Sequence, residues 1–159
     1  MSGSYPESDA SYGPNELDYY PIGSGSEWYA KWMPASPAPR RGYKIHVSTD
    51  PRLAQAVARI VLPALRAMNI FHKVVRDQDR YRRHLATSAA GKFITIYTTG
   101  DTQRNSVIQR IDTELSWLGR NTGPVPTARV GAGAGGPETA LGRSGYLFGR
   151  PYDENSGDD

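Results

Sequence analysis

Hydrophobic and polar residues alternate strictly along residues 43–48, which read Tyr-Lys-Ile-His-Val-Ser. This period of two is typical of a β-strand with one buried face, and it places Lys44 and His46 together on the other face. Other segments rich in β-branched, aromatic or aliphatic side chains predict further strands over residues 70–76, 92–98 and 141–148. The pattern therefore indicates a small β-sheet.

Between these strands, apolar residues recur at helical spacing in two segments. The first helix is expected to begin after Asp50, a residue type that caps helices, with Pro51 in its first turn, and to end at Met68. The second helix is expected over residues 101–119, and the polar, basic residues 80–88 predict a loop or a short helix. The order β, α, β, β, α, β predicts an α+β fold, with two main helices on one face of a small antiparallel or mixed sheet.

The two ends of the chain differ in composition from this core. Residues 1–26 are poor in aliphatic side chains, which predicts a disordered lead. The aromatic residues 27–33 (EWYAKWM) either pack on the domain, the interpretation we favour, or hold a peptide partner. A Gly-rich segment, residues 131–136, predicts a flexible break. We expect a largely disordered lead with a Pro-rich linker (1–41), one folded domain (42–152) and an acidic tail (153–159).

The composition excludes several classes of site. The chain of 159 residues is long enough for one domain, and it contains no cysteine, which excludes disulfides, thiolate zinc sites and cysteine nucleophiles. The absence of cysteine favours a reducing compartment such as the cytoplasm. The three histidines lack metal-ligand spacing, and no apolar run approaches the roughly 20 residues that cross a bilayer. We therefore expect a cytoplasmic protein that needs no membrane, metal ion or cofactor.

The net charge of +3 conceals an uneven distribution along the chain. Residues 40–84 carry eleven Lys and Arg against three Asp, a balance of +8, whereas residues 1–39 carry five acidic residues against one Lys. A positive block inside the folded part indicates an anionic partner, which could be nucleic acid, a phosphorylated ligand or an acidic peptide. The alternative is that these residues only form solvated helix faces.

Four side chains of the predicted strands could converge on one concave surface: Lys44, His46, Lys73 and Tyr97. Lys and His at alternate positions are more often ordinary polar residues of an exposed sheet face, so it is the convergence that indicates a site. Such a set suits elimination of phosphate from phosphoserine or phosphothreonine. That reaction needs a strong base for the Cα proton, and positive charge with an acid for the leaving phosphate. A lysine amine is a competent base once burial and neighbouring cations lower its pKa, and a histidine can protonate the leaving oxygen.

Three segments of the chain resemble the N-terminal lyase domain of class III lanthipeptide synthetases. They are residues 44–48 (KIHVS), 71–75 (FHKVV) and 91–97 (GKFITIY), within a stretch of about 108 residues. That domain is related to the phosphothreonine lyases that pathogenic bacteria inject. The resemblance implies a metal-independent carbon–oxygen lyase. It would convert phosphoserine and phosphothreonine of a precursor peptide to dehydroalanine and dehydrobutyrine, as in lanthipeptide maturation.

The resemblance also implies roles for individual residues. Lys73 matches the base that takes the Cα proton, and His46 matches the acid. Lys44 and Tyr97 match residues that line the phosphate pocket, and family arginines complete that pocket.

The arginines are where this sequence departs from the family pattern. The family has an Arg ten residues before the Tyr of the third strand, where this chain has Thr87, with Arg83 the nearest substitute. The closing family motif Tyr-Arg-Tyr-Gly is replaced by Tyr-Leu-Phe-Gly at residues 146–149. Arg150 is therefore displaced, unless Arg143 takes the place of the family residue. The injected enzymes carry a further Lys two positions before the base, and here this position is Phe71.

Two other functions remain open on the sequence alone. One is a catalytically inactive scaffold that binds a phosphorylated peptide or a leader peptide. The other is a basic nucleic-acid-binding module, which the positive block and the arginines around Tyr81 would suit but which Lys44 and Lys73 inside strands disfavour. The family's synthetases join the lyase to a kinase and a cyclase, which this sequence lacks. The lyase hypothesis therefore implies a separate kinase acting in trans, with a cyclase as a further candidate partner.

Overall fold

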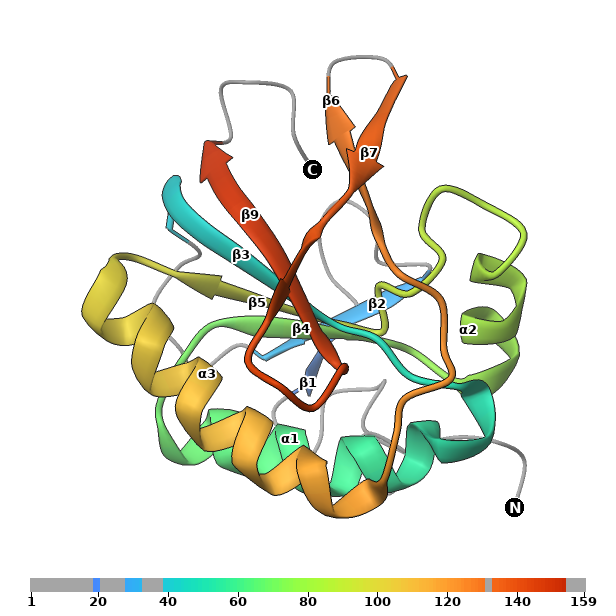
Figure 1. The fold of residues 1–159 in the computed structure, drawn as a ribbon, viewed down its shortest axis with the longest axis horizontal. Coiled ribbons are helices and arrows are strands. Elements are labelled where there is room, and N and C mark those ends of the chain that lie inside the picture. Colours follow the sequence, from blue (N-terminus) through green and yellow to red (C-terminus); the bar gives the residue numbers. More distant parts are fainter. Residues whose placement is uncertain (1–18, 21–27, 33–38, 131–132, 154–159) are drawn as a thin grey trace.

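The predicted α+β fold is confirmed: a computed structural model shows one antiparallel sheet with helices packed on it (Figure 1). The structure describes residues 19–20, 28–32, 39–130 and 133–153. In spatial order, the seven strands of the main sheet are β1 (Tyr19–Tyr20), β2 (Tyr29–Trp32), β4 (His72–Val75), β5 (Ile94–Thr98), β3 (Arg41–Val47), β9 (Leu147–Asp153) and β8 (Thr139–Leu141). Every neighbouring pair in this sheet is antiparallel.

The two main helices lie on the same face of the sheet, as predicted (Figure 1). They are α1 (Ala54–Ala67), preceded by the short 3-10 turn η2 (Pro51–Leu53), and α3 (Asp101–Leu115), followed by η3 (Ser116–Leu118). The residues expected as a loop or a short helix include α2 (Gln78–His84), at one end of the sheet. Asp50 caps η2, because its carboxylate accepts the backbone N–H of Arg52 at 2.8 Å.

The hydrophobic core lies between the sheet and the helical layer. Ile45 and Val47 of β3 point into it and are fully buried, as are Ile96 of β5 and Val61 and Leu65 of α1. Burial of each such side chain stabilises the fold by about 1.5–3 kcal/mol. Because side chains alternate along a strand, the same arrangement turns Lys44 and His46 to the opposite face of the sheet. That face, too, is covered, since Lys44 is 0% and His46 2% exposed.

The described part of the N-terminal lead belongs to the sheet, contrary to the boundary expected at residue 41. β2 pairs with β4, and β1 pairs with β2. The aromatic segment therefore packs on the domain: the Trp32 ring stacks on His72 with centroids 5.5 Å apart. The two-residue length of β1 left no periodicity from which a strand could be predicted. The other residues of 1–41 that were expected to be disordered, like most of the acidic tail, lie outside the described residues.

Two predictions for the C-terminal third were wrong. The Gly-rich segment expected to be a flexible break contributes to a hairpin formed by β6 (Thr127–Val130) and β7 (Gly133–Pro137). The strand expected over residues 141–148 is instead the end of β8, a turn, and the start of β9. The turn contains Gly142 at φ 69°, where a Cβ atom would also lie within 2.5 Å of the Asp112 carboxylate, so this position needs glycine. In the described ranges, no helix combines the length and the apolar character needed to cross a membrane.

His72 is a buried histidine of the core face with both ring nitrogens in use. Its Nδ1 donates to the carbonyl of Ile70 at 2.7 Å, so its Nε2 accepts the hydroxyl of Tyr19 at 2.6 Å. Burial lowers the pKa of His72 to about 4, although the hydrogen bond to Ile70 acts to raise it. The imidazole is therefore neutral in the folded protein at neutral pH.

This buried histidine predicts a loss of stability in mild acid. The unfolded chain takes up a proton at His72 with a pKa near 6.5, whereas the folded protein takes it up only near 4. The contribution of His72 to the free energy of unfolding should therefore fall by about 2 kcal/mol between about pH 7 and pH 5. Urea denaturation at several pH values should show that His72→Gln, which cannot titrate, has a flatter pH dependence than the unsubstituted protein. Parallel curves for the two proteins would contradict this prediction.

Candidate active site

Lys73 and His46 lie in one row across three adjacent strands. Lys73 of β4 is paired with Thr95 of β5, and Thr95 is paired with His46 of β3. Paired residues of antiparallel strands point to the same face, and two strand spacings put the Cα atoms of Lys73 and His46 about 10 Å apart. Both side chains line the same cavity, together with Tyr29, Ser88, Ala89, Lys92 and Thr95. The cavity is on the face of the sheet opposite α1 and α3.

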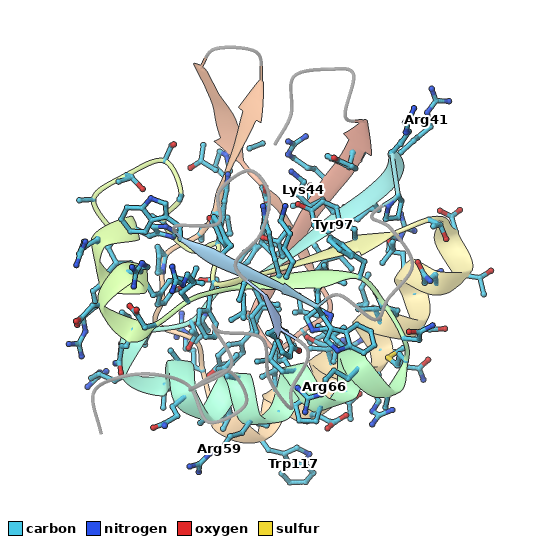
Figure 2. All side chains as sticks on the ribbon, turned by 180° about the vertical axis from the view of Figure 1, so that it is seen from behind. Arg41, Lys44, Arg59, Arg66, Tyr97 and Trp117 are labelled. Atoms are coloured by element: carbon cyan, nitrogen blue, oxygen red, sulfur yellow. The ribbon has the colours of Figure 1, made fainter. Side chains whose placement is uncertain are left out.

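A second row, two residues along β5 and β3, brings together Tyr97, Lys44 and, on the next strand β9, Arg150. Lys44 is fully buried, and its Nζ lies 4.7 Å from the ring centroid of Tyr152 and 5.8 Å from that of Tyr97. Figure 2 shows Lys44 and Tyr97 close together on the side of the sheet away from the helical layer. The aromatic rings therefore enclose the buried end of the Lys44 side chain.

The partner of His46 is a carboxylate that no local pattern in the sequence indicates. The Nδ1 of His46 donates to Oε1 of Glu138 at 2.8 Å, and Nε of Arg150 lies 3.6 Å from the other carboxylate oxygen. Glu138 follows the β6–β7 hairpin, and its backbone N–H donates to the carbonyl of Pro126 at 2.9 Å. His46 and Glu138 are separated by 92 positions, so no local pattern connects them.

Burial lowers the pKa of His46 to about 4, despite the opposing effect of the hydrogen bond and charge of Glu138. The nearby cations Lys92 and Lys44 lower it further. Burial would raise the pKa of Glu138, but His46, Lys92 and Arg150 together bring it below its usual value. The dyad therefore consists of a neutral imidazole that donates from Nδ1 to an ionised carboxylate, and its Nε2 is left as the atom that exchanges a proton.

Two further residues of the cavity were missed in the sequence. Lys92 is 6% exposed and lines the cavity, although strict alternation back from Thr95 would have turned it to the core. Alternation does not apply there, because β5 begins only at Ile94. Tyr29, from the lead, forms a wall of the cavity, with its ring centroid 4.5 Å from Nζ of Lys73. The sequence signal for Tyr29 was that it lies in the aromatic residues 27–33, which were predicted to pack on the domain.

The structure does not bring all the predicted arginines to this cavity. Arg150 reaches the His46–Glu138 dyad, as described above. Arg83 is exposed on α2, and its guanidinium carbon lies 5.9 Å from the Trp28 ring. Arg143 is exposed in the turn before β9 and lines a different cavity. Across the described ranges, no group of three His, Cys, Asp or Glu side chains is placed to hold a metal ion.

Several solved structures share this fold. The chain aligns with the phosphothreonine lyase SpvC, an effector protein from Salmonella, with a TM-score of 0.65 and 16% identity, over 94% of this chain and 81% of that one. It aligns with the type III effector phosphothreonine lyase OspF from Shigella flexneri with a TM-score of 0.64 and 14% identity, over 92% and 76% of the two chains. The VirA (SpvC) phosphothreonine lyase effector of Chromobacterium violaceum gives a TM-score of 0.63 and 14% identity, over 94% and 73%.

The sequence itself matches a family model. No curated protein sequence matches the chain significantly. The model of the RamC N-terminal domain, however, matches residues 13–127, which is more than two thirds of the chain. The matched residues contain β1 to β5, and so they include Lys44, His46, Lys73 and Tyr97. The chain therefore belongs to the family of RamC N-terminal domains.

Proposed function

We propose that this protein eliminates phosphate from phosphorylated Ser or Thr residues of a peptide. The observation that carries the proposal is the cavity that Lys73 and His46 share. The two residues are separated by the single strand β5, on a covered, cation-rich face of the sheet. A phosphorylated residue bound between them would have its Cα–H directed at Lys73 and its bridging oxygen directed at His46. The likeness of fold to phosphothreonine lyases supports the same chemistry.

The reaction needs two proton transfers and no added reactant. The amine of Lys73 takes the Cα proton, and the electron pair of that C–H bond forms the Cα=Cβ double bond. His46 takes up a proton from solvent at Nε2 when the phosphate group binds. The Cβ–O bond then breaks, and His46 gives this proton to the departing oxygen. The products are dehydroalanine from phosphoserine, or dehydrobutyrine from phosphothreonine, and inorganic phosphate. Glu138 holds the imidazole in position and stabilises its protonated form through the hydrogen bond at Nδ1.

The phosphate would be held by the cations around the cavity. Lys44 and Arg150 stand in the second row, with the hydroxyl-bearing Tyr97 beside them. Lys92, buried beside His46 and Lys73, supplies a positive charge on the side where the family arginine is replaced by Thr87. Charged hydrogen-bond donors in a site with little water stabilise the charge that develops on the leaving group.

Membership of the RamC N-terminal domain family points to the substrate class. We propose that the substrate is a lanthipeptide-type precursor peptide, processed by residues 42–152 together with β1 and β2. A kinase must supply the phosphate group, and a cyclase would use the dehydrated product. Neither partner is needed for the elimination itself.

The proposal is tested with purified protein and synthetic peptides that contain one phosphoserine or phosphothreonine. Mass spectrometry should show the loss of phosphoric acid, and a thiol should add to the new double bond, with a chelator present throughout. A phosphatase would instead leave a hydroxyl that does not react with the thiol. Tight binding of the phosphopeptides without product would reject the lyase and favour a binding scaffold.

A further inference from the structure

A second cavity, of about 680 Å³, shares no lining residue with the candidate active site and is not used by the proposed reaction. It lies between the loop that follows η3 and the turn that precedes β9. Arg120, Asn121 and Val125 line it from the loop, Arg143 from the turn and Phe148 from β9. Its volume is in the range of cavities that hold small ligands or a few peptide side chains.

Its position is fixed relative to His46 by the pairing of the sheet. Phe148 of β9 is directly opposite His46 of β3, so the two residues share a face, with Cα atoms about 5 Å apart. One residue of an extended peptide spans about 3.3 Å. A peptide whose phosphorylated residue lies between Lys73 and His46 can therefore place a side chain in the second cavity within a few residues of it.

The wall of this cavity is held rigidly to the end of β3. Nδ2 of Asn121 donates to the carbonyls of Ser48 at 3.3 Å and Gly145 at 2.9 Å. Gly123 packs so closely on the backbone of Thr49 that a Cβ atom would lie 2.4 Å from its carbonyl carbon. A ligand would therefore meet a preformed wall, which reduces the entropy lost on binding.

The charges of the lining are all positive. Arg120 and Arg143 are both exposed, and no acidic residue lines the cavity. Two carboxylates bond to segments of this wall: Asp112 accepts the backbone N–H groups of Arg143 and Ser144, both at 2.9 Å, and Asp50 accepts the hydroxyl of Thr122 at 3.0 Å. Guanidinium groups bind carboxylates and phosphates through paired hydrogen bonds. We propose that this cavity binds an anionic side chain of the substrate peptide, close in sequence to the residue that loses phosphate.

This inference rests on the proposed function. Such a cavity would make the enzyme selective for peptides with an acidic residue next to the phosphorylated one. The test uses three peptides that share one phosphoserine and carry Glu, Gln or a second phosphoserine at the flanking positions. Replacing both arginines (Arg120→Gln with Arg143→Gln) should raise KM about tenfold for the Glu peptide, the size expected when a charged hydrogen bond is lost, and leave kcat within twofold. The KM for the Gln peptide should stay unchanged. If only the doubly phosphorylated peptide responds, the anion is a phosphate and not a carboxylate.

A matched control is Arg59→Gln, an exposed arginine on the helical side of the molecule (Figure 2), which should leave all three peptides unaffected. Charge reversal (Arg120→Glu with Arg143→Glu) should make a Lys-flanked peptide the better substrate. Equal changes for Glu and Gln peptides would overturn the proposal.

The same preference can be measured without turnover. Fluorescence anisotropy of labelled peptides should show tighter binding of the Glu peptide than of the Gln peptide. If that preference is present but no elimination occurs, only the proposed function fails. If elimination occurs with no preference, only the acidic subsite fails.

Discussion

Replacing Lys73 with methionine should reduce the rate of elimination by about a thousandfold or more, because the substitution removes the amine that we propose as the base for the Cα proton. Methionine keeps the length and apolar body of the lysine side chain, so the walls of the cavity are retained and only the nitrogen that lies over the Tyr29 ring is lost. Affinity for the phosphopeptide should stay within severalfold, since Lys44, Lys92 and Arg150 remain to bind the phosphate. Single-turnover kinetics and peptide anisotropy measure the two effects separately.

The matched control for this substitution is Lys31→Met. Lys31 of β2 is paired directly with Lys73, on the same face of the sheet, but does not line the cavity. Its replacement should change the rate only slightly, which separates loss of the base from loss of one positive charge. With the unsubstituted protein, deuterium at Cα of the substrate should slow the reaction if breaking that bond limits the rate. Residual activity above a tenth in Lys73→Met would show that another group is the base.

Replacing His46 with asparagine should slow elimination of phosphate by about a hundredfold or more, in the range expected for loss of a general acid. The loss should be much smaller for a peptide that carries O-sulfoserine, because sulfate is a better leaving group and departs without a proton. Equal losses for the phosphate and sulfate esters would reject the role of His46 as the acid. Quenched-flow analysis of the two peptides gives the comparison.

The low pKa of His46 adds a pH signature to this prediction. At a pKa of about 4 the imidazole is neutral in the free protein at neutral pH, and a bound phosphate favours its protonated form. Substrate binding should therefore be coupled to proton uptake, which calorimetry detects as a dependence of the binding enthalpy on the buffer. In Glu138→Gln the carboxylate charge that favours protonated His46 is lost, so the pKa of His46 in the complex falls. Because the proposed acid must be protonated, activity should be lost with rising pH, and in this variant the loss should begin at a lower pH than in the unsubstituted protein. If Glu138 has a purely structural role, the pH profile of Glu138→Gln should be the same as that of the unsubstituted protein.

The faces of the strands could be predicted from the sequence, and the partners of the site residues could not. The alternation in residues 43–48 placed Lys44 and His46 on one face because period two is a local property of a strand. The convergence with Lys73 also agrees with the structure, since β4, β5 and β3 are neighbours in the sheet. Glu138 was missed because the fold, and not the local sequence, brings the end of the hairpin over His46. Lys92 was missed because its backbone lies just before the regular part of β5.

The lead and the C-terminal third show a different limit. β1 and β2 consist of two and four residues, too short for a periodic signal, and they are stabilised by pairing with β4. In β7 the sequence is rich in glycine, a residue that disfavours strands in isolation, and the hairpin forms nonetheless through pairing with β6. In both places tertiary pairing outweighs local propensity.

The 92 positions between His46 and Glu138 also bear on when the proposed activity can arise during synthesis of the chain. β3, β4 and β5 leave the ribosome first, and with them Lys44, His46 and Lys73. Glu138 and Arg150 emerge only with the last strands, of which β9 pairs with both β3 and β8. A nascent or prematurely terminated chain would therefore have the proposed base but a proposed acid without its carboxylate partner, and we expect elimination to begin only once the domain is complete.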